Sequence, residues 1–332
     1  MIRVRTASRL HFGLFSLPAG DPSHAAWPNS EGLPLVAARS FGGVGLMIER
    51  PGLVICAEPA ATWSAEGLLA DRSLAHARQA ATAMHWPGSL RLVLQETARE
   101  HVGLGVGTQL ALAAARLVAK AAGRDDVSAA ELACLVGRGH RSALGVHGFA
   151  QGGFLVEGGK RPPQTLAPLV SRVAFPADWR ILLVIPRDLH GAHGSREAEA
   201  FYALSRHAPG LHRTEALCRL VLLGMLPALV EGNLDTFGEA LYDFNRRVGE
   251  MFRPWQGDIY AHARTAELVR LLRSKCGVRG VGQSSWGPTL FAVTRAEHAD
   301  ELADELVRHH GCHADEILVT TAANAGAIAD AE

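Results

Sequence analysis

The feature that most constrains the fold is a run of alternating glycines that opens into a nearly apolar helix. After the last of these glycines, Thr108–Ala122 is mostly leucine, alanine and valine, and its polar positions Gln109, Arg116 and Lys120 form one narrow stripe. Such a helix is buried around most of its circumference. Alternating glycines permit a tight turn and close approach of a ligand, and a helix start presents unpaired amides to an anion. The sequence therefore predicts a phosphate-binding loop formed by Gly103, Leu104, Gly105, Val106, Gly107, Thr108 and Gln109.

The spacing differs from the two commonest phosphate loops. The Gly-Lys-Ser/Thr ending of a Walker A loop is missing, and Gly-x-Gly-x-Gly is not the dinucleotide fingerprint. Asp125 and Asp126 lie about twenty residues further on, where that fingerprint has an acidic residue, but they follow the helix directly. On spacing alone, a helix start that merely packs closely against its neighbours remains an alternative.

Charge and composition exclude several classes of function. The 332 residues carry 33 Lys+Arg and 33 Asp+Glu, and the net charge of zero argues against a nucleic-acid or anionic-membrane binder. Lysine occurs at positions 120, 160 and 275 alone, so nearly all basic residues are arginine. Coding bias toward arginine is the simpler explanation. The more specific one is that arginine side chains bind phosphate or carboxylate groups through paired hydrogen bonds. Apolar runs stay short of the roughly 18 residues that a membrane span needs.

The cysteines indicate the cellular compartment. Cys56, Cys134, Cys218, Cys276 and Cys312 are scattered, odd in number and without a CxxC pair. This distribution is typical of reduced thiols rather than of a disulfide framework or a zinc cluster. We therefore expect a cytoplasmic protein.

The hydrophobic pattern predicts an α+β fold in two sections. Short β runs, mostly bounded by glycine or proline, dominate the first hundred residues: Ile2–Arg5, Leu10–Phe15, Val44–Ile48, Leu53–Ala57 and Leu90–Gln95. A helix over Ser73–His85 comes before the glycine loop. A capping box, Ser128 to Glu131, begins another helix, and Phe154–Glu157 is a strand.

The second section begins near Trp179 with a buried strand, Ile181–Ile185, followed by a polar loop. Helices then dominate, over Thr214–Val230, Asp235–Met251 and Ile259–Ser274. The end of the chain alternates strand, amphipathic helix and strand over Thr289–Val293, Glu297–His309 and Glu316–Thr320. This order predicts an α+β lobe.

Three glycine-containing segments resemble the signatures of the GHMP kinase superfamily. Gly103–Ala115 resembles its phosphate loop, Gly280–Thr289 its glycine-rich turn near the substrate, and Thr6–Gly13 lies where its first signature belongs. The resemblance implies a two-lobed fold, with a mixed α/β lobe over residues 1–175 and a helix-rich, ferredoxin-like α+β lobe over residues 176–332. It also implies a homodimer.

The details resemble a branch of that superfamily that does not act as a kinase, the beta-ribofuranosylaminobenzene 5'-phosphate synthases. The matching strings are ASRLHFGLFSL, FGGVGLMIERP, GLGVGTQLALAAA, GVHGFAQGGFLVEGG and GQSSWGPTLFAV. In place of the catalytic aspartate of many of the kinases, this chain has His147. The resemblance implies Mg²⁺-dependent condensation of phosphoribosyl pyrophosphate with 4-hydroxybenzoate or 4-aminobenzoate. Carbon dioxide and pyrophosphate are released, in the biosynthesis of a tetrahydromethanopterin-type cofactor.

This chemistry selects candidate site residues. Arg9, Arg141 and Arg196 are candidate anchors for the 5'-phosphate and the carboxylate, and Thr108 for the metal. A histidine that accepts the proton of the acceptor's hydroxyl would enrich the ring in electrons, for which His11, His147 and His190 are candidates. Further candidates for substrate contact are Ser8, Gln283, Ser284, Ser285 and Trp286. For each arginine and histidine, a satisfied structural role is the competing interpretation, and Trp286 can equally fill the core.

Two other functions compete with the synthase. One is an ATP-dependent small-molecule kinase, which the histidine at position 147 disfavours. The other is a ligand-binding protein that has kept the scaffold and lost catalysis, which the intact glycine loop disfavours.

Overall fold

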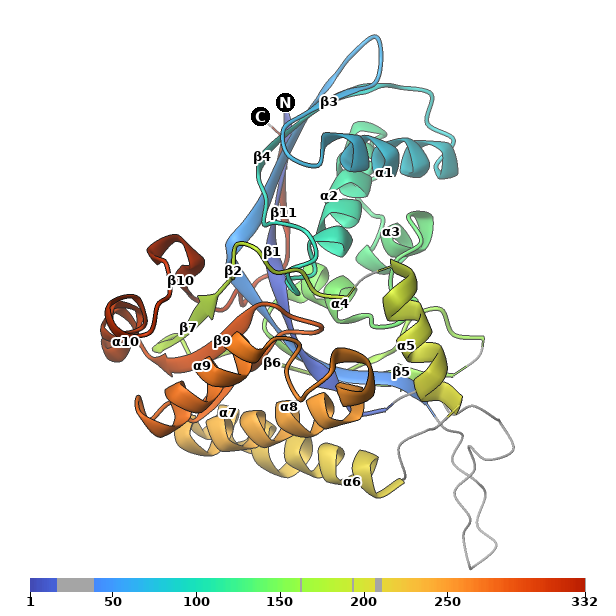
Figure 1. The fold of residues 1–332 in the computed structure, drawn as a ribbon. Helices are drawn as coiled ribbons and strands as arrows, with labels where there is room; N and C mark the ends of the chain where they lie inside the picture. The colour runs from blue at the N-terminus through green and yellow to red at the C-terminus, as the bar shows by residue number, and fades with distance from the viewer. Residues whose placement is uncertain (17–38, 162, 193, 207–210, 332) are drawn as a thin grey trace, which may run out of the picture.

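Two long antiparallel strands, β1 (Ile2–Leu14) and β2 (Ser40–Pro59), form the centre of the first sheet (Figure 1). The computed structural model describes residues 1–16, 39–161, 163–192, 194–206 and 211–331. The sequence predicts four short strands in this region, which is wrong. Each strand continues through the polar residues that separate its two apolar runs. Irregularities in the register of the β1–β2 pair accommodate these residues, one of them between Thr6 and Ser8.

The remaining strands of this sheet come from distant parts of the chain: β3 (Ser64–Glu66), β4 (Leu90–Glu96), β5 (Phe154–Lys160), β6 (Leu169–Val173) and β11 (Ile328–Ala331). In β4 the buried residues alternate as predicted. β11 pairs antiparallel with β1, so the two ends of the described chain lie together in Figure 1. The last strand therefore belongs to the first sheet, although the sequence-based division assigns it to the second lobe. The boundary at residue 175 stays a prediction.

Helices α1 (Ala70–Ala83), α2 (Val106–Ala121), α3 (Ala129–Leu135) and α4 (Leu144–Gln151) lie beside the first sheet. α2 is buried around most of its surface, as its apolar composition predicts. It begins at Val106, two residues before the predicted start, because Gly105 takes the N-cap position with a left-handed φ of 70°. The capping box of Ser128 and Glu131 is confirmed at the start of α3.

The second sheet has the ferredoxin-like arrangement that the resemblance implies. Its strands are β7 (Trp179–Val184), β8 (Gly280–Gln283), β9 (Leu290–Arg295) and β10 (Ile317–Thr320). Their order across the sheet is β10-β7-β9-β8, and every pair is antiparallel. Its helices include α8 (Leu234–Gln256), α9 (Ala263–Ser274) and α10 (Ala296–His309).

Between β7 and α8 the described chain is mainly helical, as the sequence predicts. α5 (Gly194–Arg206) occupies the end of the expected polar loop. The single predicted helix over Thr214–Val230 consists of α6 (Leu211–Leu220), a π-helical turn at Val221–Met225 and α7 (Leu226–Glu231). Pro227 is tolerated because it lies in the first turn of α7.

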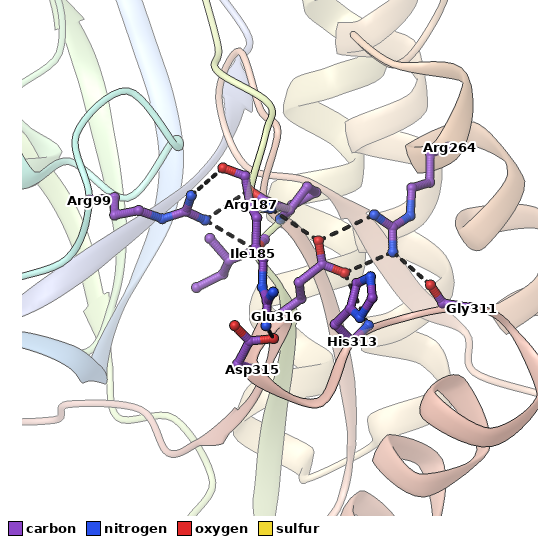
Figure 2. Close-up of polar contacts among 9 residues, drawn as sticks. Arg99, Ile185, Arg187, Arg264, Gly311, His313, Asp315 and Glu316 are labelled. Carbon is purple, nitrogen blue, oxygen red and sulfur yellow. Dashed lines mark hydrogen bonds and ion pairs between the residues drawn. The ribbon is translucent and has the colours of Figure 1, made fainter.

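The two sheets share one hydrophobic core. The rings of Phe12 in β1 and Phe291 in β9 are 4.9 Å apart at their centroids, and both are buried. A polar network adds a second connection (Figure 2). Arg99, which precedes the glycine loop, donates to backbone carbonyls at the end of β7, including that of Pro186 at 2.8 Å. Buried Glu316 accepts from Arg264 at 2.8 and 3.2 Å in the same network.

None of the five cysteines, all of which the structure describes, forms a disulfide, as predicted. Within the described ranges, none of the helices is long and apolar enough to cross a membrane.

Candidate active site

A cavity of about 280 Å³ lies between the start of α2, strand β1, and helices α5 and α8. Its wall combines positively charged, aromatic and polar side chains. They include Arg9, His11, Thr108, Arg138, His140, Arg141, Glu197, Phe201, Asn245, Phe252, Gln283, Ser285 and Trp286. Of the residues predicted from the sequence, Arg9, His11, Thr108, Arg141, Gln283, Ser285 and Trp286 are therefore brought together here.

Arg9 extends from β1 across the glycine loop. Its backbone amide donates to the carbonyl of Leu104 at 2.9 Å, and a Cβ built on Gly105 would lie 3.3 Å from its Nε. That Nε is buried and has no hydrogen-bond partner among the described residues. Burial lowers the pKa of Arg9, while Glu157 and Glu197 raise it. The Nε–H therefore lacks an acceptor, which an anionic ligand in the cavity would supply.

His11 joins the cavity to both glycine segments. Its amide donates to Oγ of Ser284 at 3.0 Å, and its carbonyl accepts from the amide of Ser285 at 2.9 Å. Oγ of Ser284 in turn donates to the carbonyl of Gly103 at 2.7 Å. Burial, with a smaller effect from Arg9, lowers the pKa of His11 well below its usual value. The imidazole is therefore neutral at pH 7.

Aromatic rings form the opposite wall. Trp286 and Phe252 meet edge to face with centroids 4.7 Å apart, and Phe201 lies 5.8 Å from Phe252. The guanidinium of Arg141 stands 5.5 Å from the centre of the Phe201 ring and pairs with Glu197 at 2.9 Å. Edge-to-face aromatic walls of this kind suit a flat, apolar ring.

Glu157, on β5 beneath the cavity, is fully buried. Its Oε2 accepts from the amide of Ala143 at 2.6 Å, and its Oε1 has no partner within the described structure. Burial raises the pKa of Glu157 to about 7, although Ser142, Ala143 and Arg9 oppose the shift. The carboxyl is therefore close to half ionised at neutral pH.

Two further arginines lie over the first turn of α2. A Cβ on Gly107 would be 3.2 Å from Nη2 of Arg72 and 4.0 Å from Nη2 of Arg138. Arg138 contacts Nε2 of His76 at 3.1 Å, and Arg72 pairs with Glu100. Burial, then the charges of Arg138 and Arg72, lower the pKa of His76 to about 4. Positive charge is therefore concentrated at this helix start.

Several predicted site residues have other partners. Nε2 of His147 bonds the carbonyl of Ala167 at 2.8 Å, outside the cavity wall, and His190 is exposed. The hydroxyl of Ser8 donates to the carbonyl of Pro51. Gln109 is buried, accepts from Thr6 at 2.5 Å and donates to Gly145 at 2.8 Å. Ser284 is taken up by the contacts with His11 and Gly103, and the side chain of Arg196 lies outside the described part of the chain.

The sequence analysis missed Glu157, Arg72, Arg138 and the aromatic residues of α5 and α8. A signal for Arg138 was present, because residues 137–142 read Gly-Arg-Gly-His-Arg-Ser, with basic side chains between glycines. Glu157 and Arg72 carry no such local signal, since their neighbours in space are distant in sequence.

Residues 225–311 match the family described as GHMP kinases C terminal. A beta-ribofuranosylphenol 5'-phosphate synthase of Archaeoglobus fulgidus is 32% identical over 307 residues, covering 89% of this chain and 88% of the relative. The synthase of the same name from Methanothermobacter thermautotrophicus is 32% identical over 316 residues, 88% of each chain.

Solved structures show the same fold at low sequence identity. Homoserine kinase from Cytophaga hutchinsonii superposes with a TM-score of 0.66 at 14% identity, over 99% of this chain and 97% of the kinase. Mevalonate diphosphate decarboxylase from Staphylococcus aureus superposes with a TM-score of 0.62 at 11% identity, over 100% and 99% of the two chains.

Proposed function

The chain belongs to the beta-ribofuranosylphenol 5'-phosphate synthase family, within the GHMP kinase fold, and we propose that it condenses phosphoribosyl pyrophosphate with 4-hydroxybenzoate. 4-Aminobenzoate is the alternative acceptor. The observation that carries the proposal is the cavity itself, whose wall combines Arg9, with its buried Nε unpartnered among the described residues, and aromatic rings beside a glycine loop. This combination suits a benzoate acceptor next to a phosphate-bearing donor.

The reaction balances without a further co-reactant. The bond between the anomeric carbon and the pyrophosphate oxygen breaks, and the ring carbon that carries the carboxylate bonds to the anomeric carbon. The ring–carboxylate bond then breaks, carbon dioxide leaves, and its electron pair restores the aromatic ring. The protein must therefore hold the carboxylate of the acceptor and the pyrophosphate of the donor, and it must make the acceptor's ring electron-rich.

Arg9 anchors the carboxylate of the acceptor, and the ring lies against Trp286 and Phe252. His11 is the one of the three candidate histidines that lines the cavity, which supports it as the partner of the phenol hydroxyl. Because its pKa is lowered, the neutral imidazole accepts a hydrogen bond from that hydroxyl. The proton shifts toward His11 as the ring attacks and returns to the oxygen as carbon dioxide departs.

The amides at the start of α2 and the glycine loop hold the pyrophosphate end of the donor. Mg²⁺ would enter as a companion of the donor, with the Thr108 hydroxyl at the cavity wall as its ligand from the protein. Mg²⁺ commonly keeps water and phosphate oxygens as its main ligands. When bound, the ion would offset the negative charge of the leaving group. The Thr108 hydroxyl would hold the ion from the protein side.

Two further expectations concern the cellular compartment and the oligomeric state. Five cysteines without a disulfide fit the reducing cytoplasm. A homodimer, as the resemblance implies, is tested by light scattering of the purified protein.

The decisive experiment follows carbon dioxide from carboxyl-labelled 4-hydroxybenzoate in the presence of phosphoribosyl pyrophosphate and Mg²⁺, with 4-aminobenzoate in parallel. Donor-dependent release of carbon dioxide with stoichiometric pyrophosphate is the expected result.

Because the fold is shared with homoserine kinase, a small-molecule kinase is the second candidate. Acceptor-dependent formation of ADP from ATP over a panel of small alcohols and acids, without carbon dioxide release, would establish the kinase instead. Ligand binding without either turnover would indicate a non-catalytic member of the fold.

A further inference from the structure

We propose that Arg72 and Arg138, together with the first turn of α2, form a subsite that binds the pyrophosphate group of the donor. The subsite rests on the proposed function and adds two residues from outside the glycine loop. Arg72 belongs to α1, and Arg138 follows α3. Arg138 lines the cavity, and Arg72 approaches the same turn of α2 from outside the cavity wall.

The Arg72 guanidinium can approach the first turn of α2 because position 107 is a glycine that the backbone does not require. Gly107 lies inside α2 and is not among the glycines with positive φ. A glycine in a helix destabilises it relative to alanine. A Cβ there would press against Nη2 of Arg72 at 3.2 Å, the far end of a flexible side chain. Alanine would therefore fold at this position but would displace the guanidinium.

The charges at the helix start are unbalanced without a ligand. Arg72 is held by Glu100 and Arg141 by Glu197, whereas the contact of Arg138 is His76. Because a guanidinium can only donate, His76 accepts and is neutral, and so contributes no negative charge. Nε of Arg138 is buried without a partner in the described structure. Burial, then the charges of Arg72 and Arg141, lower the pKa of Arg138.

Pyrophosphate matches this arrangement better than a carboxylate does. It carries several negative charges and has more oxygen acceptors, and two guanidinium forks can each bind it through paired hydrogen bonds. The amides of Val106 and Gly107, in the first turn of α2, have no acceptor within their own helix. These amides are the third group of donors in the subsite, beside the two guanidinium groups.

The test measures binding of inorganic pyrophosphate with Mg²⁺ by calorimetry, and the KM for phosphoribosyl pyrophosphate. The full-length chain is compared with its Arg72→Gln, Arg138→Gln and Gly107→Ala variants. Arg78→Gln is the matched control, because Arg78 lies on the same helix and is exposed. Thermal melts verify folding, and 4-hydroxybenzoate binding is the internal reference.

Each arginine substitution is expected to weaken pyrophosphate binding by roughly 10- to 100-fold, the range for hydrogen bonds between charged groups. Gly107→Ala is expected to weaken pyrophosphate binding without lowering the melting temperature. The Arg78 control and 4-hydroxybenzoate binding stay at the parental values.

The outcomes separate this subsite from the synthase reaction. A parent that releases carbon dioxide while both arginine variants keep the parental KM and pyrophosphate affinity overturns the subsite alone. A parent that binds pyrophosphate through these arginines, but turns over ATP rather than benzoate, keeps the subsite and removes the synthase. A parent that does not bind pyrophosphate overturns the subsite.

Discussion

At the scale of single residues, the site is built from groups whose ionisation depends on burial. Glu157 and His11 are both shifted toward their neutral forms, and burial also lowers the pKa of Arg9, against the opposing effects of Glu157 and Glu197. The same burial makes the stability of the fold depend on pH in a defined way.

Glu157→Gln is expected to change the pH dependence of stability. The pKa of Glu157 is about 7 in the folded protein against 4.5 ordinarily. A raised pKa gives stability that is present below the unfolded value and is lost as pH rises through the folded value. Between about pH 4.5 and 7 the parent should lose about 3 kcal/mol relative to the glutamine variant. Urea denaturation at a series of pH values measures this, and parallel stability curves would contradict it.

Arg9→Gln is expected to weaken 4-hydroxybenzoate binding by about 1.5–3 kcal/mol, because a hydrogen-bonded charge pair is lost. Arg5→Gln is the control on the same strand. Arg5 is about half exposed and pairs with Asp330, and such surface pairs contribute about 0–1 kcal/mol to stability. Isothermal calorimetry should show parental affinity for the control. Equal effects of the two substitutions would remove Arg9 from the acceptor site.

At the scale of elements, glycines decide where α2 begins and ends. Gly105 has φ of 70° before the helix, and Gly123 has φ of 69° after it. A Cβ on Gly105 would lie 3.2 Å from Cβ of Arg9, whereas a Cβ on Gly123 would meet nothing within 4 Å. The two positions therefore share a backbone requirement and differ in their surroundings.

Alanine at either position is expected to cost about 1–2 kcal/mol of stability, the strain of a left-handed conformation. Gly105→Ala should additionally raise the KM for the donor, since it moves Arg9 and the loop. Steady-state kinetics and denaturation of both variants separate the two effects. Donor binding that is equally intact in both variants would place the donor elsewhere.

The elements also show what the sequence could predict. α2 and α3 were predictable because glycine and a capping box mark their limits. β6, β8 and β11 are short strands whose pairing partners are distant, and short runs carry little periodicity. Within the site, a cationic residue next to a glycine loop was predictable. Whether His147 or Ser8 faces the cavity or bonds the backbone carbonyl of another residue was not predictable, because the carbonyls concerned, of Ala167 and Pro51, lie far along the chain.

At the scale of the whole molecule, the lobes are joined by packing and by charge. Phe12 and Phe291 connect the two sheets in the core, and the network of Arg99 and Glu316 connects them at its edge. Burial alone would raise the pKa of Glu316, but hydrogen bonds from Arg264 and from backbone amides outweigh it and hold that pKa at about 2.

We therefore expect the two lobes to unfold together in a single transition. Phe291→Ala should lower stability by about 3–5 kcal/mol, the usual cost of truncating a buried phenylalanine, and should shift the whole transition. Far-ultraviolet circular dichroism and tryptophan fluorescence should report coincident midpoints. Two separated transitions, one of them unaffected by the substitution, would show that the lobes are independent.

The pairing of β11 with β1 has a consequence for synthesis on the ribosome. Roughly 300 residues separate the two strands, and at typical elongation rates their translation takes roughly 15–60 s. During that interval β1 has a bare hydrogen-bonding edge, a template for pairing with other nascent chains. Chaperones that shield the emerging chain should therefore matter most for yield before the final strand is released.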